Sequence, residues 1–96
     1  MRRDAIVIKR QDNVATAIQD IPRGKSAAVG IEEESMTVQV IQDIPLGHKL
    51  ALRRIGSGEE ILKYGSVIGR ATQDIQPGEH VHVHNVQSLR GRGDWA

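Results

Sequence analysis

Gln42-Asp43-Ile44-Pro45-Leu46-Gly47 is the stretch from which the fold is best predicted, because closely similar stretches recur within the same 96 residues. Asp, Ile and Gly stand at the same places in Gln19-Asp20-Ile21-Pro22-Arg23-Gly24 and in Gln73-Asp74-Ile75-Gln76-Pro77-Gly78. A shorter copy, Arg54-Ile55-Gly56-Ser57-Gly58-Glu59, keeps the Ile and the Gly but lacks the Asp. The chain therefore repeats one local structure.

Each residue type in the repeat has a physical reason to form a tight turn. The Asp accepts local backbone N–H bonds, the Ile anchors the turn in the core, the Pro fixes φ, and the Gly adopts a conformation that a Cβ would penalise. The unit is read as strand, turn, strand. Because the intervals between copies, 23 and 31 residues, are irregular, we expect one compact domain rather than an open solenoid.

The segments between the turns have the composition of short strands. Ile and Val supply 20 residues, against 5 Leu and no Phe, and β-branched side chains favour pleated sheets. We predict a mainly β, single small domain of six or seven short strands, with strands over 5–9, 26–31, 36–41, 49–53, 67–72 and 80–86. Residues 14–18 fit either a strand or one helical turn, and Glu32-Glu33-Glu34 is read as a hairpin turn.

Composition restricts the class of protein. A net charge of +1 and 2% aromatic residues make nucleic acid an unsuitable partner, and the longest apolar run is far too short to span a membrane. The absence of Cys fits a soluble, cytoplasmic protein. We place the domain at residues 1–88 and a polar tail at 89–96, where Trp95 either anchors another chain or is incidental.

The run from Gly78 to Asn85 concentrates the residues that can carry chemistry. In an extended strand, alternation puts His80, His82 and His84 on one outward face and the two intervening valines, at 81 and 83, in the core. Two adjacent imidazoles, such as His82 and His84, can bind one metal ion, whereas the outer two lie about 13 Å apart along a straight strand. The alternative is an ordinary polar strand face.

The fourth histidine, His48, stands beside Lys49 directly after the second turn. If the fold brings the ends of the turns together, these two residues and the three other histidines form a basic pocket suited to carboxylates. The alternative is an exposed pair in a loop.

Four stretches together resemble the SAF domain, of β-clip fold, that is found in the altronate and galactarate dehydratase family. They are residues 12–15, 43–52, 63–71 and 78–85, including Lys63-Tyr64-Gly65 and Gly78-Glu79-His80-Val81-His82-Val83-His84-Asn85. The resemblance implies an accessory role in the dehydration of a sugar acid such as altronate. It also implies a divalent metal, often iron, in the active site of a larger catalytic subunit. That larger subunit is implied because the fused dehydratases continue well beyond the position of Ala96.

The same resemblance implies roles for single residues. The histidines at 80, 82 and 84 bind substrate and transfer protons, His48 and Lys49 bind its carboxylate, Asn85 orients a hydroxyl, and Tyr64 with Gly65 shapes the pocket. Two alternatives stay open: the small subunit of a sulfolactate sulfo-lyase, and a non-catalytic module that binds a sugar acid or docks a partner. Whether the chain forms a homo-oligomer is also open.

Overall fold

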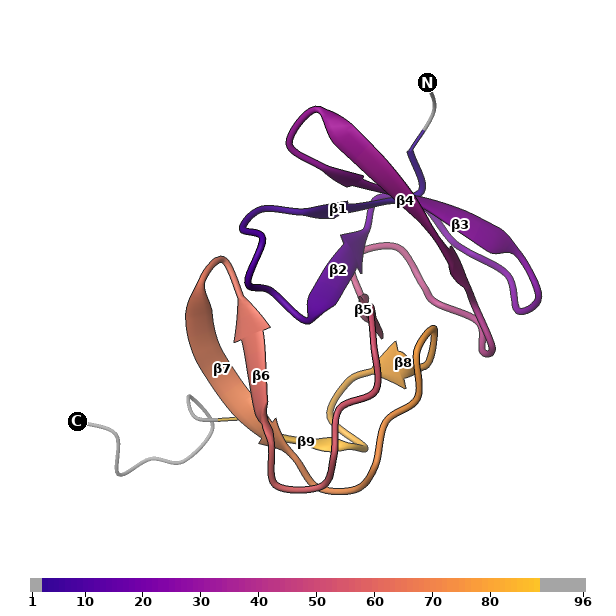
Figure 1. Cartoon of the computed structure of the whole chain (residues 1–96). Helices are drawn as coiled ribbons and strands as arrows, with labels where there is room; N and C mark the ends of the chain where they lie inside the picture. The colour runs from indigo at the N-terminus through magenta and orange to yellow at the C-terminus, as the bar shows by residue number, and fades with distance from the viewer. Residues whose placement is uncertain (1–2, 89–96) are drawn as a thin grey trace.

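The computed structural model describes residues 3–88, which form two β-sheets (Figure 1). The large sheet has the strand order β4-β3-β1-β2-β5-β8 and the small sheet has the order β6-β7-β9. The large sheet contains β1 (Ala5–Val7), β2 (Val14–Ala17), β3 (Ser26–Ile31), β4 (Glu34–Gln39), β5 (Lys49–Ala51) and β8 (His80–Val81). The small sheet contains β6 (Glu60–Lys63), β7 (Ser66–Ala71) and β9 (Val86–Ser88).

The predicted mainly β architecture is confirmed, with nine strands in the described range rather than six or seven. Residues 14–17 form a strand, not a helical turn, and Glu32 and Glu33 form the turn between β3 and β4 as expected. None of the described residues lies in a helix long and apolar enough to cross a membrane. The tail at 89–96, with Trp95, lies outside the described residues.

One predicted strand is wrong. Residues 80–86 do not form a single strand, because the chain leaves the large sheet after Val81, turns, and joins the small sheet at Val86. Val81 is fully buried as expected, whereas Val83 is 81% exposed instead of facing the core. The turn brings the third histidine of the run back beside the first, with 5.3 Å between the ring centroids of His80 and His84.

The repeated turns fold as two pairs. Ile21 bridges to Ile44, and Ile55 bridges to Ile75, so the short fourth copy is a true member of the repeat. All four isoleucines are at most 1% exposed, which confirms that they anchor the turns in the core. The first pair packs in a hydrophobic cluster on the large sheet, and the second pair packs in a separate cluster that includes β6 and β7 residues.

The aspartates of the turns bond across each pair rather than locally, so the predicted local bonding was wrong. Asp20 accepts the N–H of Leu46 at 2.8 Å, and Asp43 accepts the N–H of Arg23 at 2.8 Å. In the second pair only Asp74 is available, and it accepts the N–H of Ser57 at 2.9 Å. Each carboxylate therefore joins two turns that are distant in sequence.

A buried polar contact attaches the β6–β7 hairpin to the rest of the domain. The carboxylate of Asp12, which is 3% exposed, accepts the N–H groups of Tyr64 at 2.9 Å and Gly65 at 2.8 Å. Next to it, the Asn13 side chain bonds the backbone of Leu62 and Glu60. Tyr64 and Gly65 both have positive φ, at 58° and 76°, as two-residue hairpin loops favour.

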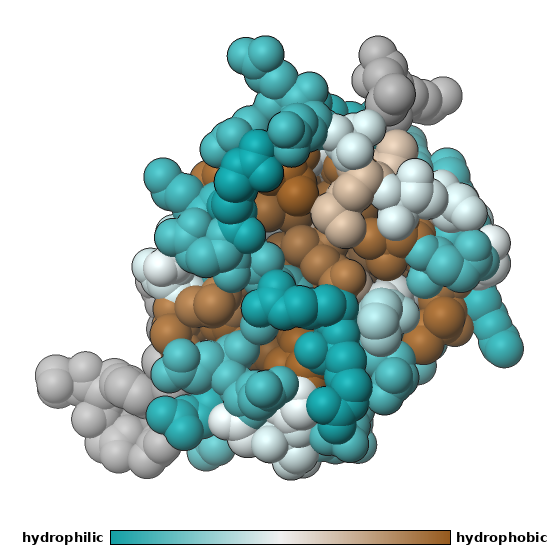
Figure 2. Space-filling model, in the orientation of Figure 1, coloured by the Kyte–Doolittle hydropathy of each residue, from teal (hydrophilic) through white to brown (hydrophobic). Residues whose placement is uncertain are grey.

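The surface is not uniformly polar. Figure 2 shows apolar residues toward the middle of the face that is drawn, bordered by hydrophilic residues. Among the described residues, Val83, Leu46 and Tyr64 are the most exposed large apolar side chains, at 81%, 61% and 54%. Two of these three, Val83 and Tyr64, line the pocket described below.

Candidate functional site

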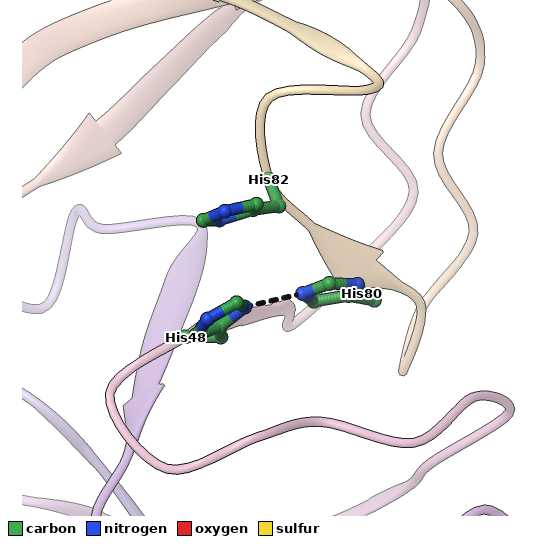
Figure 3. Close-up of side chains that lie close together, drawn as sticks. All are labelled: His48, His80 and His82. Carbon is green, nitrogen blue, oxygen red and sulfur yellow. Dashed lines mark hydrogen bonds between the residues drawn. The ribbon is translucent and has the colours of Figure 1, made fainter.

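Three histidines from two parts of the chain meet at the edge of the large sheet (Figure 3). His48 closes the second turn, His80 begins β8, and His82 follows β8 directly. The antiparallel pairing of β5 with β8 brings them together, since Leu50 lies opposite His80 and Lys49 lies opposite Val81. We call these three residues the histidine group.

The three imidazoles are close enough to act together. Nδ1 of His48 and Nε2 of His80 are 2.8 Å apart, a hydrogen bond in which one ring donates and the other accepts. The rings of His48 and His82 stack with centroids 4.1 Å apart and an interplanar angle of 17°. One nitrogen from each ring lies within 4.8 Å of the others. The group therefore offers nitrogen lone pairs within a small volume.

Backbone contacts hold each member of the histidine group. The N–H of His48 donates to Pro45 O at 2.9 Å, and the N–H of His80 donates to Oε1 of Gln42 at 2.9 Å. The N–H of His82 donates to Oδ1 of Asn85 at 2.9 Å. Sequence reasoning missed Gln42, because its contact with His80 joins residues 38 positions apart in the chain.

The environment of His80 and His82 favours their neutral forms. Burial lowers the pKa of His80, and the nearby His48, His84, His82 and Lys49 lower it further. Burial also lowers the pKa of His82, together with His48, Lys49 and His84. The pKa of Lys49 is lowered by its burial and then by Lys63. Burial first, and then the neighbouring basic groups, make these three side chains hold their protons less tightly than in water.

A pocket of about 360 Å³ adjoins the histidine group. Its charged and polar walls come from Lys49 of β5, Lys63 and Tyr64 of the β6–β7 hairpin, and His82. The remaining lining residues are Ile68, Val83, Val86 and Ser88. We call it the lysine pocket. Two lysines among apolar lining residues suit a small anion, and His82 belongs both to this wall and to the histidine group.

Of the remaining residues that the sequence predicted for the site, some lie at the site and others do not. Tyr64 lines the lysine pocket, and Gly65 lies beside it in the hairpin turn. The expected metal pair was His82 and His84, but only His82 belongs to the histidine group, while His84 is exposed beside His80. Lys63 was not singled out from the sequence, although it precedes the Tyr-Gly turn directly.

Asn85 supports the site from inside instead of facing a ligand. It is 0% exposed, and its side chain accepts the N–H of His82 and donates to His80 O at 2.9 Å. Its amide also lies 3.5 Å from Oε2 of Glu79. The predicted contact with a substrate hydroxyl therefore does not fit the geometry of this chain, in which Asn85 holds the turn that carries His82.

Comparison with known proteins identifies the family of the chain. The family model for the altronate/galactarate dehydratase SAF domain matches residues 3–89. An altronate dehydratase of Bacillus subtilis is 43% identical over 83 residues, which are 86% of this chain and 16% of that protein. A (2R)-sulfolactate sulfo-lyase subunit alpha of Chromohalobacter salexigens is 38% identical over 90 residues, which are 91% of this chain and 96% of that subunit.

A galactarate dehydratase (L-threo-forming) of Escherichia coli is 36% identical over 76 residues, 79% of this chain and 14% of that enzyme. The chain thus spans only about a sixth of the altronate dehydratase, as the 16% coverage states, but nearly the whole sulfo-lyase alpha subunit. The region matched by the family model includes the strands of both sheets and the histidine run. The chain belongs to the altronate/galactarate dehydratase SAF domain family.

Proposed function

We propose that this chain is the small, accessory part of a sugar-acid hydro-lyase of the altronate dehydratase type, completed by a larger catalytic polypeptide. The relatives support this proposal, because the matched region is one domain of a longer dehydratase in one case and a separate alpha subunit in another. The larger polypeptide supplies the remainder of the active site.

The observation that carries the proposal is that His82 lies in the wall of a pocket with two lysines. The lysine pocket binds the carboxylate of the sugar acid through Lys49 and Lys63, and the apolar lining covers the carbon chain. The pKa of Lys49 is lowered first by its burial and then by Lys63, and a bound carboxylate would favour the charged form of both lysines. A substrate held this way presents its hydroxyl groups toward the histidines.

Dehydration next to a carboxylate has two electrostatic demands. Removing the α proton builds negative charge on the carboxylate, and the departing hydroxyl takes up a proton. Lys49 and Lys63 stabilise the first charge. His84, which is exposed beside the histidine group, is placed to give up the second proton.

The divalent metal that the family implies, with iron as the expected ion, fits the donor set of this chain. Imidazole nitrogens bind first-row metals such as iron, zinc and nickel, and the histidine group offers three of them. When bound, such an ion supplies electrostatic stabilisation of a substrate oxygen. His48, His80 and His82 are the residues that would hold it.

Reconstitution with a large polypeptide of the same family tests the proposal. We expect loss of altronate to require both polypeptides and to be abolished when His80, His82 and His84 are all replaced by Ala. Gln87→Ala, an exposed substitution in β9, is the matched control and leaves the rate unchanged. Full activity of the triple variant, or of the large polypeptide alone, would show that this chain is a non-catalytic module.

A second candidate function is that of a sulfolactate sulfo-lyase small subunit. It is favoured by one observation, the 96% coverage of the Chromohalobacter salexigens alpha subunit. The same reconstituted complex, assayed in parallel with altronate and with sulfolactate, distinguishes the two reactions. Release of sulfite without consumption of altronate would replace the hydro-lyase proposal by this one.

A further inference from the structure

We propose that His48, His80 and His82 form a divalent transition-metal site within this chain itself, with three nitrogen ligands and an open position facing the lysine pocket. The family resemblance puts a metal in the larger polypeptide, and the sequence favoured a pair at 82 and 84. The structure instead gathers three imidazoles whose ligand atoms lie within 4.8 Å of one another.

The distances require only side-chain movement. Metal–nitrogen bonds of about 2.0–2.1 Å in a tetrahedral site put the ligand nitrogens about 3.3 Å apart. Nδ1 of His48 and Nε2 of His80 are now 2.8 Å apart and have to separate slightly, while His82 has to approach. Because the rings are stacked, their lone pairs converge only after rotation about the Cβ–Cγ bonds. The hydrogen bond between His48 and His80 breaks, and its proton moves to the other nitrogen of the donor ring.

The backbone at all three positions is already fixed. His80 and the segment after His48 are paired in the large sheet, and His82 is held by the buried side chain of Asn85. A second layer of contacts that orients ligands is typical of metal sites and strongly affects their affinity. The burial of Asn85, which substrate binding does not explain, is accounted for by this positioning role.

The donor set predicts which ions bind. Three neutral imidazoles without a carboxylate favour Zn²⁺, Co²⁺, Ni²⁺ and Fe²⁺ over Mg²⁺ and Ca²⁺, which prefer oxygen ligands. His82 also lines the lysine pocket, so an ion held by the histidine group would adjoin Lys49 and Lys63. An anionic oxygen would suit the fourth position, because both lysines favour negative charge there.

Direct metal binding to the untagged 96-residue chain tests the site. After chelation and dialysis, Co²⁺ titration followed by visible absorption should show one site, with the intense bands of a four-coordinate ion. Replacing His48, His80 or His82 singly by Ala should weaken binding at least about 100-fold, since even second-layer changes cost 10–100-fold. His84→Ala is the matched control and should leave the affinity unchanged. Mg²⁺ should not compete.

Two measurements separate loss of the site from loss of the fold. Circular dichroism of each variant reports the fold, and NMR of the wild-type chain reports which histidine ring nitrogens shift when Zn²⁺ is added. No Co²⁺ or Zn²⁺ binding by the folded wild-type chain, or an equal loss on His84→Ala, would overturn the assignment. Because no partner or turnover is needed, a chain that binds metal but supports no dehydration would disprove only the proposed function.

Discussion

At the scale of single residues, the burial of His80 among other basic side chains makes the stability of the fold depend on pH. Its pKa is lowered by burial, then by His48, His84 and His82, and by Lys49. In the unfolded chain this histidine titrates near its ordinary pKa of about 6.5, so the unfolded state takes up a proton before the folded state does. Stability is therefore fully present above this value and falls as the pH drops through it.

We expect the unfolding temperature of the metal-free chain to be lower at pH 5 than at pH 7.5, as measured by thermal circular dichroism. Asp4 does not contribute in this window: burial raises its pKa, but hydrogen bonds from Ala28 N–H, Lys25 and Gln19 outweigh burial and lower it. Asp74 has a lowered pKa as well, through Ser57 N–H and Arg54. His80→Gln should reduce the pH effect, and an equal or larger effect in this variant would contradict the explanation.

Asn85 gives a second prediction at the same scale. Replacing it by Ala leaves the N–H of His82 and the carbonyl of His80 without their partners. Each unsatisfied buried group costs about 1–3 kcal/mol, so we expect a loss of roughly 2–4 kcal/mol in the free energy of unfolding. Chemical denaturation checks this value. Gln87→Ala serves as the exposed control, and equal stability of the two variants would refute the supporting role of Asn85.

At the scale of elements, the four turns share a backbone conformation but not the same surroundings. Gly58 and Gly78 have φ values of 86° and 81°. A Cβ at position 58 would meet nothing within 4 Å, whereas a Cβ at position 78 would lie 1.9 Å from Gln39 O. The turn that ends at Gly78 therefore needs its glycine for close approach as well as for conformation.

Gly78→Ala and Gly58→Ala separate these two requirements. The change at 58 should cost about 1–2 kcal/mol, the penalty of a left-handed conformation for a residue with a Cβ. The change at 78 should cost more, because the strand segment at Gln39 has to move. It should also weaken Co²⁺ binding, since Gly78 precedes the strand that carries His80. Equal unfolding free energies for the two variants would show that the close contact is relieved without cost.

The elements also show which parts of the fold could be predicted from the sequence. The repeated turns and their buried isoleucines follow from local chemistry, so they were predictable. Which turns pair was not, because Asp20 and Leu46 meet through contacts 26 residues apart. The alternating run from His80 indicated a strand, but the Asn85 side chain captures the His82 N–H and forces a turn. Alternation alone cannot report that competing hydrogen bond.

For the same reason, the candidate site could be predicted only in part. The histidines and Lys49 were found because of their residue types and spacing. Lys63 and Gln42 were missed, because their contribution depends on which elements are adjacent in space. A pocket between the two sheets is a long-range property, and no local pattern in the chain encodes it.

At the scale of the whole molecule, the lysine pocket depends on how the small sheet is attached to the large one. Lys49 and His82 border the pocket from the side of the large sheet, while Lys63 and Tyr64 belong to the β6–β7 hairpin. The attachment includes the buried carboxylate of Asp12, which accepts N–H groups at the tip of this hairpin. Position 12 therefore influences the pocket without lining it.

Asp12→Ala should loosen the hairpin as a unit. Because the N–H groups of Tyr64 and Gly65 lose a buried acceptor, we expect faster hydrogen exchange for amides across residues 60–71 and a loss of roughly 2–3 kcal/mol in unfolding free energy. Asp20→Ala is the matched control, because the Asp20 carboxylate accepts the N–H of Leu46, which is not part of the β6–β7 hairpin.

In the reconstituted enzyme, Asp12→Ala should raise the KM for the sugar acid. Its Co²⁺ affinity should stay unchanged, because the histidine group lies on the large-sheet side. Unaltered exchange at 60–71 would mean that the hairpin is held by its apolar contacts alone.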